Sequence, residues 1–323
     1  MSKTAQTPPP PTPTSPSWTG VSDPALAPVV PSGLLEADCT KLLRSLPDDC
    51  LDLIYTDPPF CTGKTQHLSS IRASVDGLLI RPDFQGHTGR YKQISEHEYR
   101  DDMPFEEYLE WLEVVLRDMH RVLRPSGSLY LHLDFHAVHY AKVILDSIFG
   151  RDHFINEIIW SYDFGGRPRD RWPRKHDNIL WYAKSDAFTF NREDMDRLPY
   201  LAPGLVGPVK AARGKLPTDV WQMTIVPTNS GDRTGWPTQK PLPIARRIIR
   251  ASSNPGDLVA DFFGGSGTVA VAADELDRRF LVADINPEAV AIARKRLACH
   301  RAGLPFRATP ARPAKDAGKT DGD

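Results

Sequence analysis

The sequence has few cysteines and no long apolar run, and each shortage excludes a class of protein. A Cys-x-x-Cys pair and a zinc-ligand spacing are both absent from its four cysteines, Cys39, Cys50, Cys61 and Cys299. These are interpreted as reduced, partly buried thiols, and no metal site is predicted. No stretch approaches the roughly 20 apolar residues of a membrane helix, and the start lacks the apolar segment of a signal peptide. A cytoplasmic protein without a membrane partner is therefore expected.

Net charge is also nearly absent, at a formal −1. Bulk positive charge is thus excluded as the basis of nucleic-acid binding, which would have to rest on a local basic surface. Apolar residues at 40% and charged residues at 25% match an ordinary globular protein, and the chain is long enough to bury a substantial core.

Proline, by contrast, is abundant and concentrated near the start of the chain. Residues 1–33 contain the run from Pro8 to Pro11 and few apolar residues, which predicts a disordered leader. Residues 303–323 are rich in Ala, Pro, Lys and Asp and are predicted to form a disordered tail. The folded domain is expected between them, at residues 34–302.

Within this domain the apolar patterns of strands and helices alternate. Residues 51–55 form a short apolar run that ends at prolines, which predicts a strand. From Phe105 to Leu123 the apolar residues recur at i, i+3, i+4 and i+7, which predicts an amphipathic helix that starts after Pro104. Further strands are expected at 128–134, 155–162, 178–184, 258–263 and 279–285, and further helices at 137–150, 241–252, 287–300 and after Gly267. The alternation predicts an α/β fold with a mainly parallel central sheet and helices on both faces.

A glycine-rich turn after one of these strands indicates an adenosine-bearing cofactor. The strand ends at Asp261, the turn Gly264-Gly265-Ser266-Gly267 follows, and the next strand ends in Asp284. Glycines let a ligand approach the backbone closely, and an acid after the second strand can bind ribose hydroxyls. The same residues fit G-x-G-x-x-A, so a nicotinamide or flavin stays open, as does a simple tight turn. Asp261 favours S-adenosylmethionine, because a carboxylate repels a pyrophosphate and attracts a sulfonium or an ammonium.

A second corner, Asp57-Pro58-Pro59-Phe60, directly follows the strand at 51–55. The exocyclic amine of adenine or cytosine is a poor nucleophile because its lone pair is delocalised into the ring. The Asp57 carboxylate and the Pro58 carbonyl can each accept one of its N–H groups and direct the lone pair at a methyl group. Proline rigidity holds the second acceptor in place. Phe60 offers a face on which a base rotated out of the duplex can stack.

Together these motifs resemble those of the beta class of bacterial DNA amino-methyltransferases, which use S-adenosylmethionine and act on adenine N6 or cytosine N4. Residues 57–60 resemble the catalytic D/N/S-P-P-Y/F motif of the class, and Asp261-Phe-Phe-Gly-Gly-Ser-Gly267-Thr resembles its cofactor loop. The catalytic motif precedes the cofactor loop, which is the permuted order of that class. The resemblance covers about residues 34–300 and implies a Rossmann-like methyltransferase fold.

The resemblance also implies roles for individual residues. Asp57, Pro58, Pro59 and Phe60 would be catalytic. An acid at position 38 would contact the cofactor's adenine, and the segment Trp236-Pro-Thr-Gln-Lys240-Pro241 would hold its methionine end. The implied cofactor-binding residues are Asp38, Thr238, Lys240, Asp261, Phe263, Gly265, Ser266, Gly267, Thr268 and Asp284.

A basic segment, residues 165–178, is the predicted contact to double-stranded DNA. Arginine and lysine close to a tryptophan suit phosphate contacts combined with stacking, although a solvated charged loop is the alternative. The candidate DNA-binding residues are Arg167, Arg169, Arg171, Trp172, Arg174 and Lys175. A second basic cluster contains Lys210, Arg213 and Lys215, and the long stretch from Cys61 to Asp102 is expected to close over the flipped base or the DNA backbone.

The class implies a catalytic half at 34–184, a target-recognition segment at 185–235 and a cofactor half at 236–302. Alternatives are an amine methyltransferase acting on protein or RNA and, more remotely, a nicotinamide oxidoreductase. Asp57 favours adenine, but Phe60 departs from the tyrosine typical of adenine enzymes, so the target base stays open. The role would be restriction–modification or epigenetic marking on the bacterial nucleoid. A cognate restriction endonuclease and a second copy of the chain are the partners that this role allows. No role follows for His176, and Cys61 is interpreted as a packing residue.

Overall fold

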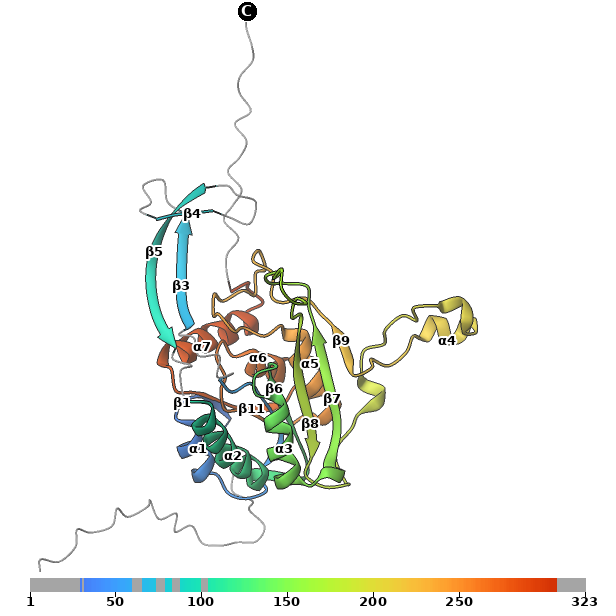
Figure 1. Ribbon diagram of the computed structural model, residues 1–323. Coiled ribbons are helices and arrows are strands. Elements are labelled where there is room, and N and C mark those ends of the chain that lie inside the picture. Colours follow the sequence, from blue (N-terminus) through green and yellow to red (C-terminus); the bar gives the residue numbers. More distant parts are fainter. Residues whose placement is uncertain are drawn as a thin grey trace, which may run out of the picture.

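A central sheet runs through the protein in the computed structural model, which describes residue 30 and residues 32–59, 66–73, 79–82, 88–99 and 104–306 (Figure 1). From edge to edge its eight strands are β1 (Gly33–Glu36), β11 (Arg279–Asp284), β10 (Leu258–Asp261), β2 (Leu51–Thr56), β6 (Leu123–Leu133), β8 (His176–Ala183), β7 (Phe154–Ser161) and β9 (Val220–Gln222). Neighbours are parallel except where β8 pairs with β6 and with β7. The prediction of a mainly parallel sheet is confirmed.

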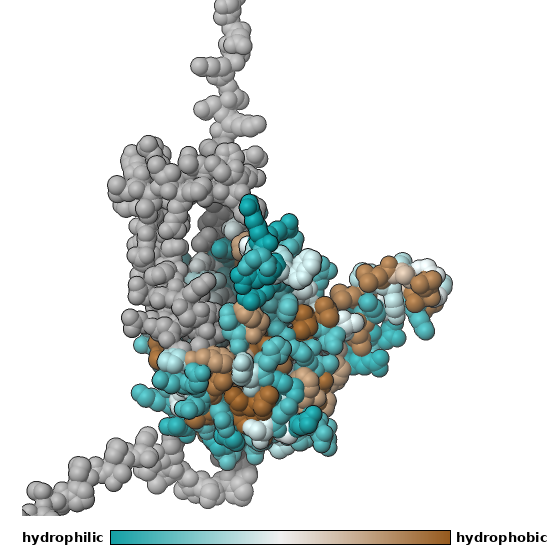
Figure 2. Space-filling model, in the orientation of Figure 1, coloured by the Kyte–Doolittle hydropathy of each residue, from teal (hydrophilic) through white to brown (hydrophobic). Residues whose placement is uncertain are grey.

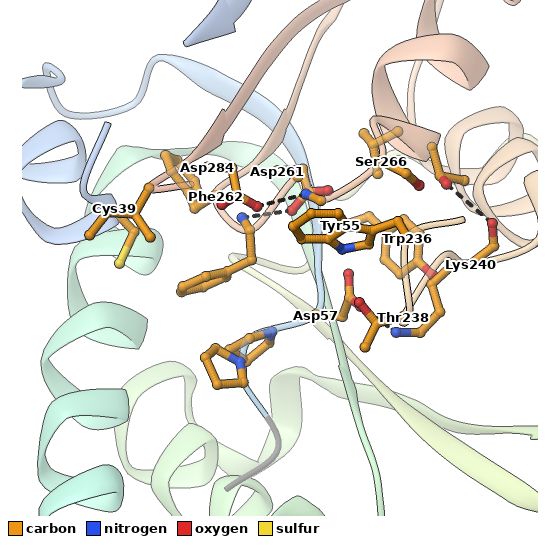
Figure 3. Close-up of a pocket in the computed structure, with 18 of the residues that line it drawn as sticks. Cys39, Tyr55, Asp57, Trp236, Thr238, Lys240, Asp261, Phe262, Ser266 and Asp284 are labelled. Carbon is orange, nitrogen blue, oxygen red and sulfur yellow. Dashed lines mark hydrogen bonds and ion pairs between the residues drawn. The ribbon is translucent and has the colours of Figure 1, made fainter. Parts of the chain in front are cut away.

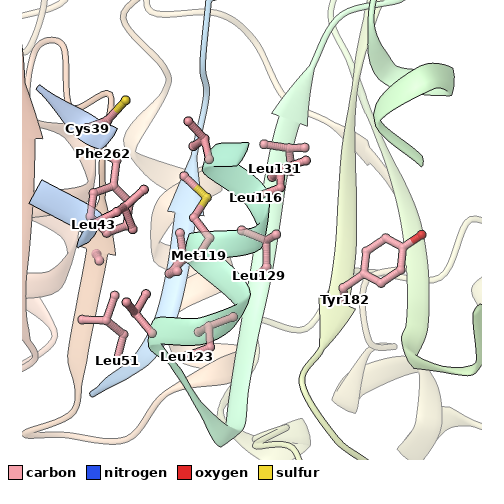
Figure 4. Close-up of a cluster of buried hydrophobic side chains, with 14 of the residues drawn as sticks. Cys39, Leu43, Leu51, Leu116, Met119, Leu123, Leu129, Leu131, Tyr182 and Phe262 are labelled. Carbon is pink, nitrogen blue, oxygen red and sulfur yellow. The ribbon is translucent and has the colours of Figure 1, made fainter. Parts of the chain in front are cut away.

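Helices cover both faces of this sheet because each presents an apolar stripe to it. One buried cluster includes residues of α1 (Cys39–Ser45), α2 (Phe105–Val122) and α3 (Val138–Phe149), and the other includes residues of α5 (Leu242–Ser252), α6 (Thr268–Glu275) and α7 (Pro287–Arg301). Figure 4 shows Leu116 and Met119 of α2 beside Leu129 and Leu131 of β6. Burial of each such side chain contributes about 1.5–3 kcal/mol, so the two clusters fix the helices on the sheet.

The strand order reverses between β2 and β10. From β2 the chain continues to α2 and β6 on one side, whereas from β10 it continues through α6 to β11 on the other. A crevice forms outside the carboxyl ends of two strands that diverge in this way. Asp57 directly follows β2 and Asp261 ends β10, so both predicted acids lie at this crevice. Because β2 precedes β10 in the chain, the predicted permuted order holds.

The folded region extends past the predicted boundaries at both ends. Ser32 exchanges hydrogen bonds with the backbone of β11, and Arg279 donates to the carbonyl of Val30, whose side chain is buried. At the other end, the Lys295 ammonium lies 4.9 Å from the centre of the Phe306 ring. Residues assigned to the leader (30, 32 and 33) and to the tail (303–306) therefore belong to the domain. The rest of the predicted leader and tail lies outside the described residues.

The stretch from Cys61 to Asp102 contains a small sheet that the sequence patterns do not predict. β3 (Gln66–Ala73), β5 (Thr88–Tyr99) and β4 (Leu79–Pro82) pair antiparallel in that order. The side chains of this stretch, like Phe60 and Cys61, lie outside the described residues. Its predicted closure over DNA stays a prediction.

An arm formed by residues 197–218 projects from the domain, inside the predicted recognition segment (Figures 1 and 2). Two backbone hydrogen bonds between Leu198 and Lys215 close its base, and it carries η3 (Pro203–Leu205) and α4 (Pro208–Arg213). Apolar side chains near its end are exposed, among them Leu205 and Val209. Two further 3-10 turns, η1 (Arg151–His153) and η2 (Arg192–Asp194), lie elsewhere in the chain.

Gly267 is the N-cap of α6 and lies in close contact with α7. Its φ is +77°, and a Cβ added to it would lie 2.7 Å from the Cβ of Ala293. We therefore expect Gly267→Ala to lower the free energy of unfolding by about 1–3 kcal/mol, through backbone strain and overpacking. Urea denaturation measures this loss. The matched control is Gly204→Ala on the arm, where nothing lies within 4 Å; equal stability of the two variants would contradict the packing role.

Candidate active site

A pocket of about 220 Å³ lies at the reversal point between β2 and β10 (Figure 3). The structure brings most of the predicted site residues into its lining: Asp38, Asp57, Pro58, Pro59, Thr238, Lys240, Asp261, Phe263, Gly265, Ser266, Thr268 and Asp284. Gly267 is outside the lining and has the packing role described above. Four other lining residues, Trp236, Gln239, Phe262 and Gly264, lie within the quoted motifs but are not in the predicted set. The remaining lining residues, which these motifs do not contain, are Cys39, Tyr55, Trp111, Val269 and Ile285.

Asp261 is a buried carboxylate held by donors from its own strand end and from β2. The Thr56 hydroxyl donates to its Oδ1 at 2.8 Å, and the backbone N–H of Phe263 donates to the same oxygen at 3.0 Å. Only 3% of Asp261 is exposed. Burial, followed by the negative charge of Asp57, raises the pKa of Asp261 to about 8. A cation in the pocket would favour the ionised form, so the pocket is suited to a positively charged ligand.

Asp57 is paired with Lys240, a residue 183 positions away. The Lys240 ammonium donates to Oδ2 of Asp57, and both side chains are largely buried. The backbone carbonyl of Lys240 accepts from the Thr268 hydroxyl at 3.1 Å, which connects this residue to the start of α6. Sequence reasoning assigns Lys240 to the cofactor alone; the structure adds a direct contact with the predicted catalytic acid.

Asp284, the predicted ribose ligand, also shapes the glycine loop. Its Oδ2 accepts from the N–H of Gly265 and its Oδ1 from the N–H of Asn286, both at 2.8 Å. Burial raises its pKa. Each oxygen can accept a further bond, so contact with a hydroxyl is compatible with this role. At Gly265, where φ is +48°, an added Cβ would lie 2.9 Å from the indole nitrogen of Trp236, so the loop and this ring lie in close contact.

Arg296 is a structural residue of the site that the motifs do not reveal. It is 1% exposed, yet its guanidinium donates to both carboxylate oxygens of Asp232, at 2.9 and 2.7 Å. It also donates to the hydroxyl of Thr268 at 2.8 Å and to Ser266. This buried cation thus joins α7, the cofactor loop and the segment before Lys240. The one feature of the sequence that could have indicated this role is the position of Arg296 among the apolar residues on the buried face of α7.

A chain of polar side chains lies behind the pocket. The Tyr55 hydroxyl and His132 Nδ1 are 3.2 Å apart, and His132 Nε2 and the Asp177 carboxylate are 3.4 Å apart. Tyr162 donates to the other oxygen of Asp177 at 3.0 Å. Burial lowers the pKa of the fully enclosed His132, which is therefore neutral at pH 7. Asp177, which directly follows His176 on β8, therefore connects β8 to this chain.

Asp38 has a local structural role as well as a place in the lining. Its carboxylate accepts from the N–H of Lys41 and caps α1.

None of the described helices is long and apolar enough to cross a membrane. Over the same residues, no group of three or more His, Cys, Asp or Glu is placed to hold a metal ion.

Residues 165–175 of the basic segment lie between β7 and β8, outside the pocket lining, and its last three residues belong to β8. Trp172 is 92% exposed. Arg171 pairs with Asp170 at 2.8 Å, whereas Arg169 forms no ion pair with any described residue. Arg174 lies 3.6 Å from the centre of the Phe135 ring, and Lys175 donates to two backbone carbonyls of its own loop. Arg167 lies 3.8 Å from Asp163.

Comparison with known proteins identifies relatives over most of the chain. A family model described as DNA methylase matches residues 51–295. The chain is 33% identical over 266 residues to the Type II methyltransferase M.HpaI of Haemophilus parainfluenzae, covering 82% of this chain and 73% of that one. It is 27% identical over 278 residues to the DNA adenine methyltransferase YhdJ of Escherichia coli K12, covering 82% of each.

A solved structure supports the fold. The cytosine-N4-specific PvuII DNA methyltransferase aligns with a TM-score of 0.56 at 18% identity, over 81% of this chain and 85% of that one. The likeness confirms the predicted Rossmann-like methyltransferase fold.

The raised pKa of Asp261 predicts a pH-dependent stability. Because the folded-state pKa of about 8 lies above the usual 3.8, the folded chain retains a proton that the unfolded chain releases. This contribution is complete below about pH 4 and is lost as the pH rises through 8. Asp261→Asn keeps the acceptor oxygen but cannot ionise, so it does not lose this contribution as the pH rises. The melting temperature of the variant minus that of the unaltered protein should therefore increase by at least about 2 °C from pH 5 to pH 8.5.

Thermal denaturation of the ligand-free protein at both pH values tests this expectation. The matched control is Asp186→Asn, whose side chain is fully exposed and should show no such trend. A constant difference between Asp261→Asn and the unaltered protein would show that Asp261 does not titrate in this range.

Proposed function

The chain belongs to the DNA methylase family, and we propose that it transfers a methyl group from S-adenosylmethionine to the exocyclic amine of an adenine or cytosine in duplex DNA, at specific sequences. Membership removes the oxidoreductase alternative and favours DNA over protein or RNA as substrate. The observation that carries the proposal is the convergence of two corners: Asp57-Pro58-Pro59 and the glycine loop line one pocket, although about 200 residues separate them.

The pocket residues fit S-adenosylmethionine by the chemistry of their donors and charges. Asp261 suits the cationic end of the cofactor, since a positive charge favours its ionised form. Lys240 and Thr238 suit the carboxylate of the methionine part, and Asp284 suits the ribose hydroxyls. Asp38 and Phe263 also line the pocket, where the carboxylate can accept from the adenine amine and the ring offers an apolar face. The cofactor supplies a methyl group on a positively charged sulfur.

Asp57 and Pro58 orient the target amine. The Asp57 carboxylate accepts one N–H, the Pro58 carbonyl accepts the other, and the nitrogen lone pair is then directed along the line of transfer. With the cofactor bound, the oriented amine would accept its methyl group, and the remainder of the cofactor, a neutral thioether, would be the leaving group. The nitrogen then loses a proton, for which the Asp57 carboxylate is the adjacent acceptor. Phe60 is proposed to stack on the base.

The basic surface supplies the contact with DNA phosphates. The candidate residues are Arg167, Arg169, Arg171, Trp172, Arg174 and Lys175, and their exposed loop agrees with this role. The arm adds Arg197, Lys210, Arg213 and Lys215, and residues 197–218 contain no acid. We assign target recognition to residues 185–235, catalysis to 34–184 and cofactor binding to 236–302.

The cellular role is proposed from the same family. Relatives include enzymes named Type II methyltransferases, which suits pairing with a cognate restriction endonuclease on the nucleoid. A homodimer also stays a proposal. The names of relatives include both an adenine enzyme and a cytosine-N4 enzyme, so adenine and cytosine are both retained as targets.

Nucleoside analysis tests the function directly. Purified protein is incubated with methyl-labelled S-adenosylmethionine and unmethylated genomic DNA, the DNA is digested, and the labelled nucleoside is identified by mass. N6-methyldeoxyadenosine or N4-methyldeoxycytidine is expected. Label in C5-methylcytosine, or in added RNA or protein instead of DNA, would refute the proposal.

Loss of the Asp57 carboxylate should stop transfer with little effect on cofactor affinity. We expect Asp57→Ala and the isosteric Asp57→Asn to lower kcat by about 100-fold or more, since the amine loses its charged acceptor. The dissociation constant of S-adenosylhomocysteine, measured by calorimetry, should stay within about fivefold of that of the unaltered protein, which is about 1 kcal/mol of binding free energy. Asp186→Asn is the control, and a kcat near normal in both Asp57 variants would exclude the role.

Loss of positive charge in the basic loop should weaken DNA binding in a salt-dependent way. For the double variant Arg169→Ala/Arg171→Ala we expect lower affinity and a salt slope reduced by about 1–2, because each phosphate that an arginine no longer neutralises keeps its counterion. Fluorescence anisotropy with a labelled duplex at several salt concentrations measures both. Arg117→Ala, an exposed site on α2, is the control. An unchanged slope would place the DNA elsewhere.

A further inference from the structure

The Lys240 ammonium binds one oxygen of the carboxylate that the target amine needs. Lys240 Nζ donates to Asp57 Oδ2, and only 9% and 19% of the two side chains are exposed. Two charges with so little access to water hold one another in a fixed geometry. While this pair exists, the ammonium uses one hydrogen-bond acceptor site of Asp57 and partly neutralises its negative charge. The carboxylate is then a poorer partner for the N–H group of a base.

The backbone of Lys240 is fixed, so only its side chain can move. Its carbonyl accepts from the Thr268 hydroxyl at 3.1 Å, and that hydroxyl accepts from the buried Arg296 at 2.8 Å. Pro241 restricts the backbone of the residue before it. The four-carbon side chain, in contrast, has rotatable bonds that let the ammonium reach a second partner inside the same pocket.

The charges of the cofactor provide that second partner. Its sulfonium and ammonium repel another cation in a poorly solvated pocket, whereas its carboxylate attracts one. Lys240 lines the pocket together with Asp57 and with Thr238 and Gln239, which directly precede it in the chain. Among the other described residues of the lining there is no lysine or arginine, so Lys240 is the side chain in this part of the lining with a positive charge to offer the carboxylate.

Building on the proposed function, we propose that Lys240 is a positioning residue with two alternative partners. It pairs with Asp57 when the cofactor is absent and with the cofactor's carboxylate when the cofactor is bound. Both oxygens of Asp57 are thus released from the ammonium, and the full negative charge is available to the target amine, only in the loaded protein. A base is then extruded and held only where a methyl donor is already present.

The first test compares two ligands that differ in the charged end. S-adenosylhomocysteine carries the carboxylate and 5′-methylthioadenosine lacks it, and calorimetry with the full chain gives the ratio of their affinities. Lys240→Met should reduce this ratio by about 10-fold or more, because it removes a charge-assisted hydrogen bond. Lys240→Arg, which keeps the charge, should restore most of it.

Lys295→Met, at an exposed position of α7, is the control and should keep the ratio of the unaltered protein. An unchanged ratio in Lys240→Met would overturn the proposal. This first test needs no DNA. Its result therefore decides the role of Lys240 even if nucleoside analysis were to refute the proposed function.

The second test measures when the base leaves the duplex. A fluorescent analogue replaces the target base in a duplex carrying the sequence at which genomic DNA becomes methylated. With the unaltered protein, the rise in fluorescence should require S-adenosylhomocysteine, whereas with Lys240→Met it should reach at least half its full size without it. An equal rise with and without S-adenosylhomocysteine in the unaltered protein would contradict the dependence on cofactor, as would an unchanged requirement in Lys240→Met.

Discussion

Two carboxylates at the ends of adjacent parallel strands carry more negative charge than a poorly solvated crevice tolerates, and the organisation of the site follows from that constraint. Asp261 is buried and its pKa is raised to about 8, with Asp57 among the causes. Thr56 and the N–H of Phe263 stabilise one acid, and Lys240 pairs with the other. A positively charged cofactor would relieve the same repulsion. The reversal of strand order between β2 and β10 is what brings the two acids together.

This arrangement joins two requirements of amine methylation in one place. A methyl group on a cationic sulfur needs negative charge nearby, and a flat amine needs an anionic acceptor beside a rigid carbonyl. β10 delivers the first through Asp261, and β2 delivers the second through Asp57 and the prolines that follow. Arg296, buried and bonded to Ser266 and Thr268, holds the cofactor loop while Thr268 holds Lys240. Cofactor binding and amine binding therefore share one network of hydrogen bonds.

The sequence predicts those parts of the site that depend on local pattern. Both acids are predictable because each ends an apolar strand next to residues with a strong backbone preference, proline after Asp57 and glycine after Asp261. Hydrophobic periodicity predicts neither the pairing of Lys240 with Asp57 nor the contacts of Arg296. Both depend on which side chains meet after the sheet has formed. The motif predicts a cofactor role for Gly267, and the structure adds a close contact with Ala293 of α7 that the motif does not reveal. The small sheet β3–β5 is not predicted because its strands lack the apolar alternation of a core.

The central claim is that one carboxylate and one proline-held carbonyl grip the same amine. It is tested most directly by a crystal structure of the protein with a non-reactive analogue of S-adenosylmethionine and a duplex that carries the target sequence. We expect the exocyclic nitrogen of an extruded base to lie within about 3.2 Å of both the Asp57 carboxylate and the Pro58 carbonyl. A base bound in the pocket with Asp57 turned away from that nitrogen would contradict it.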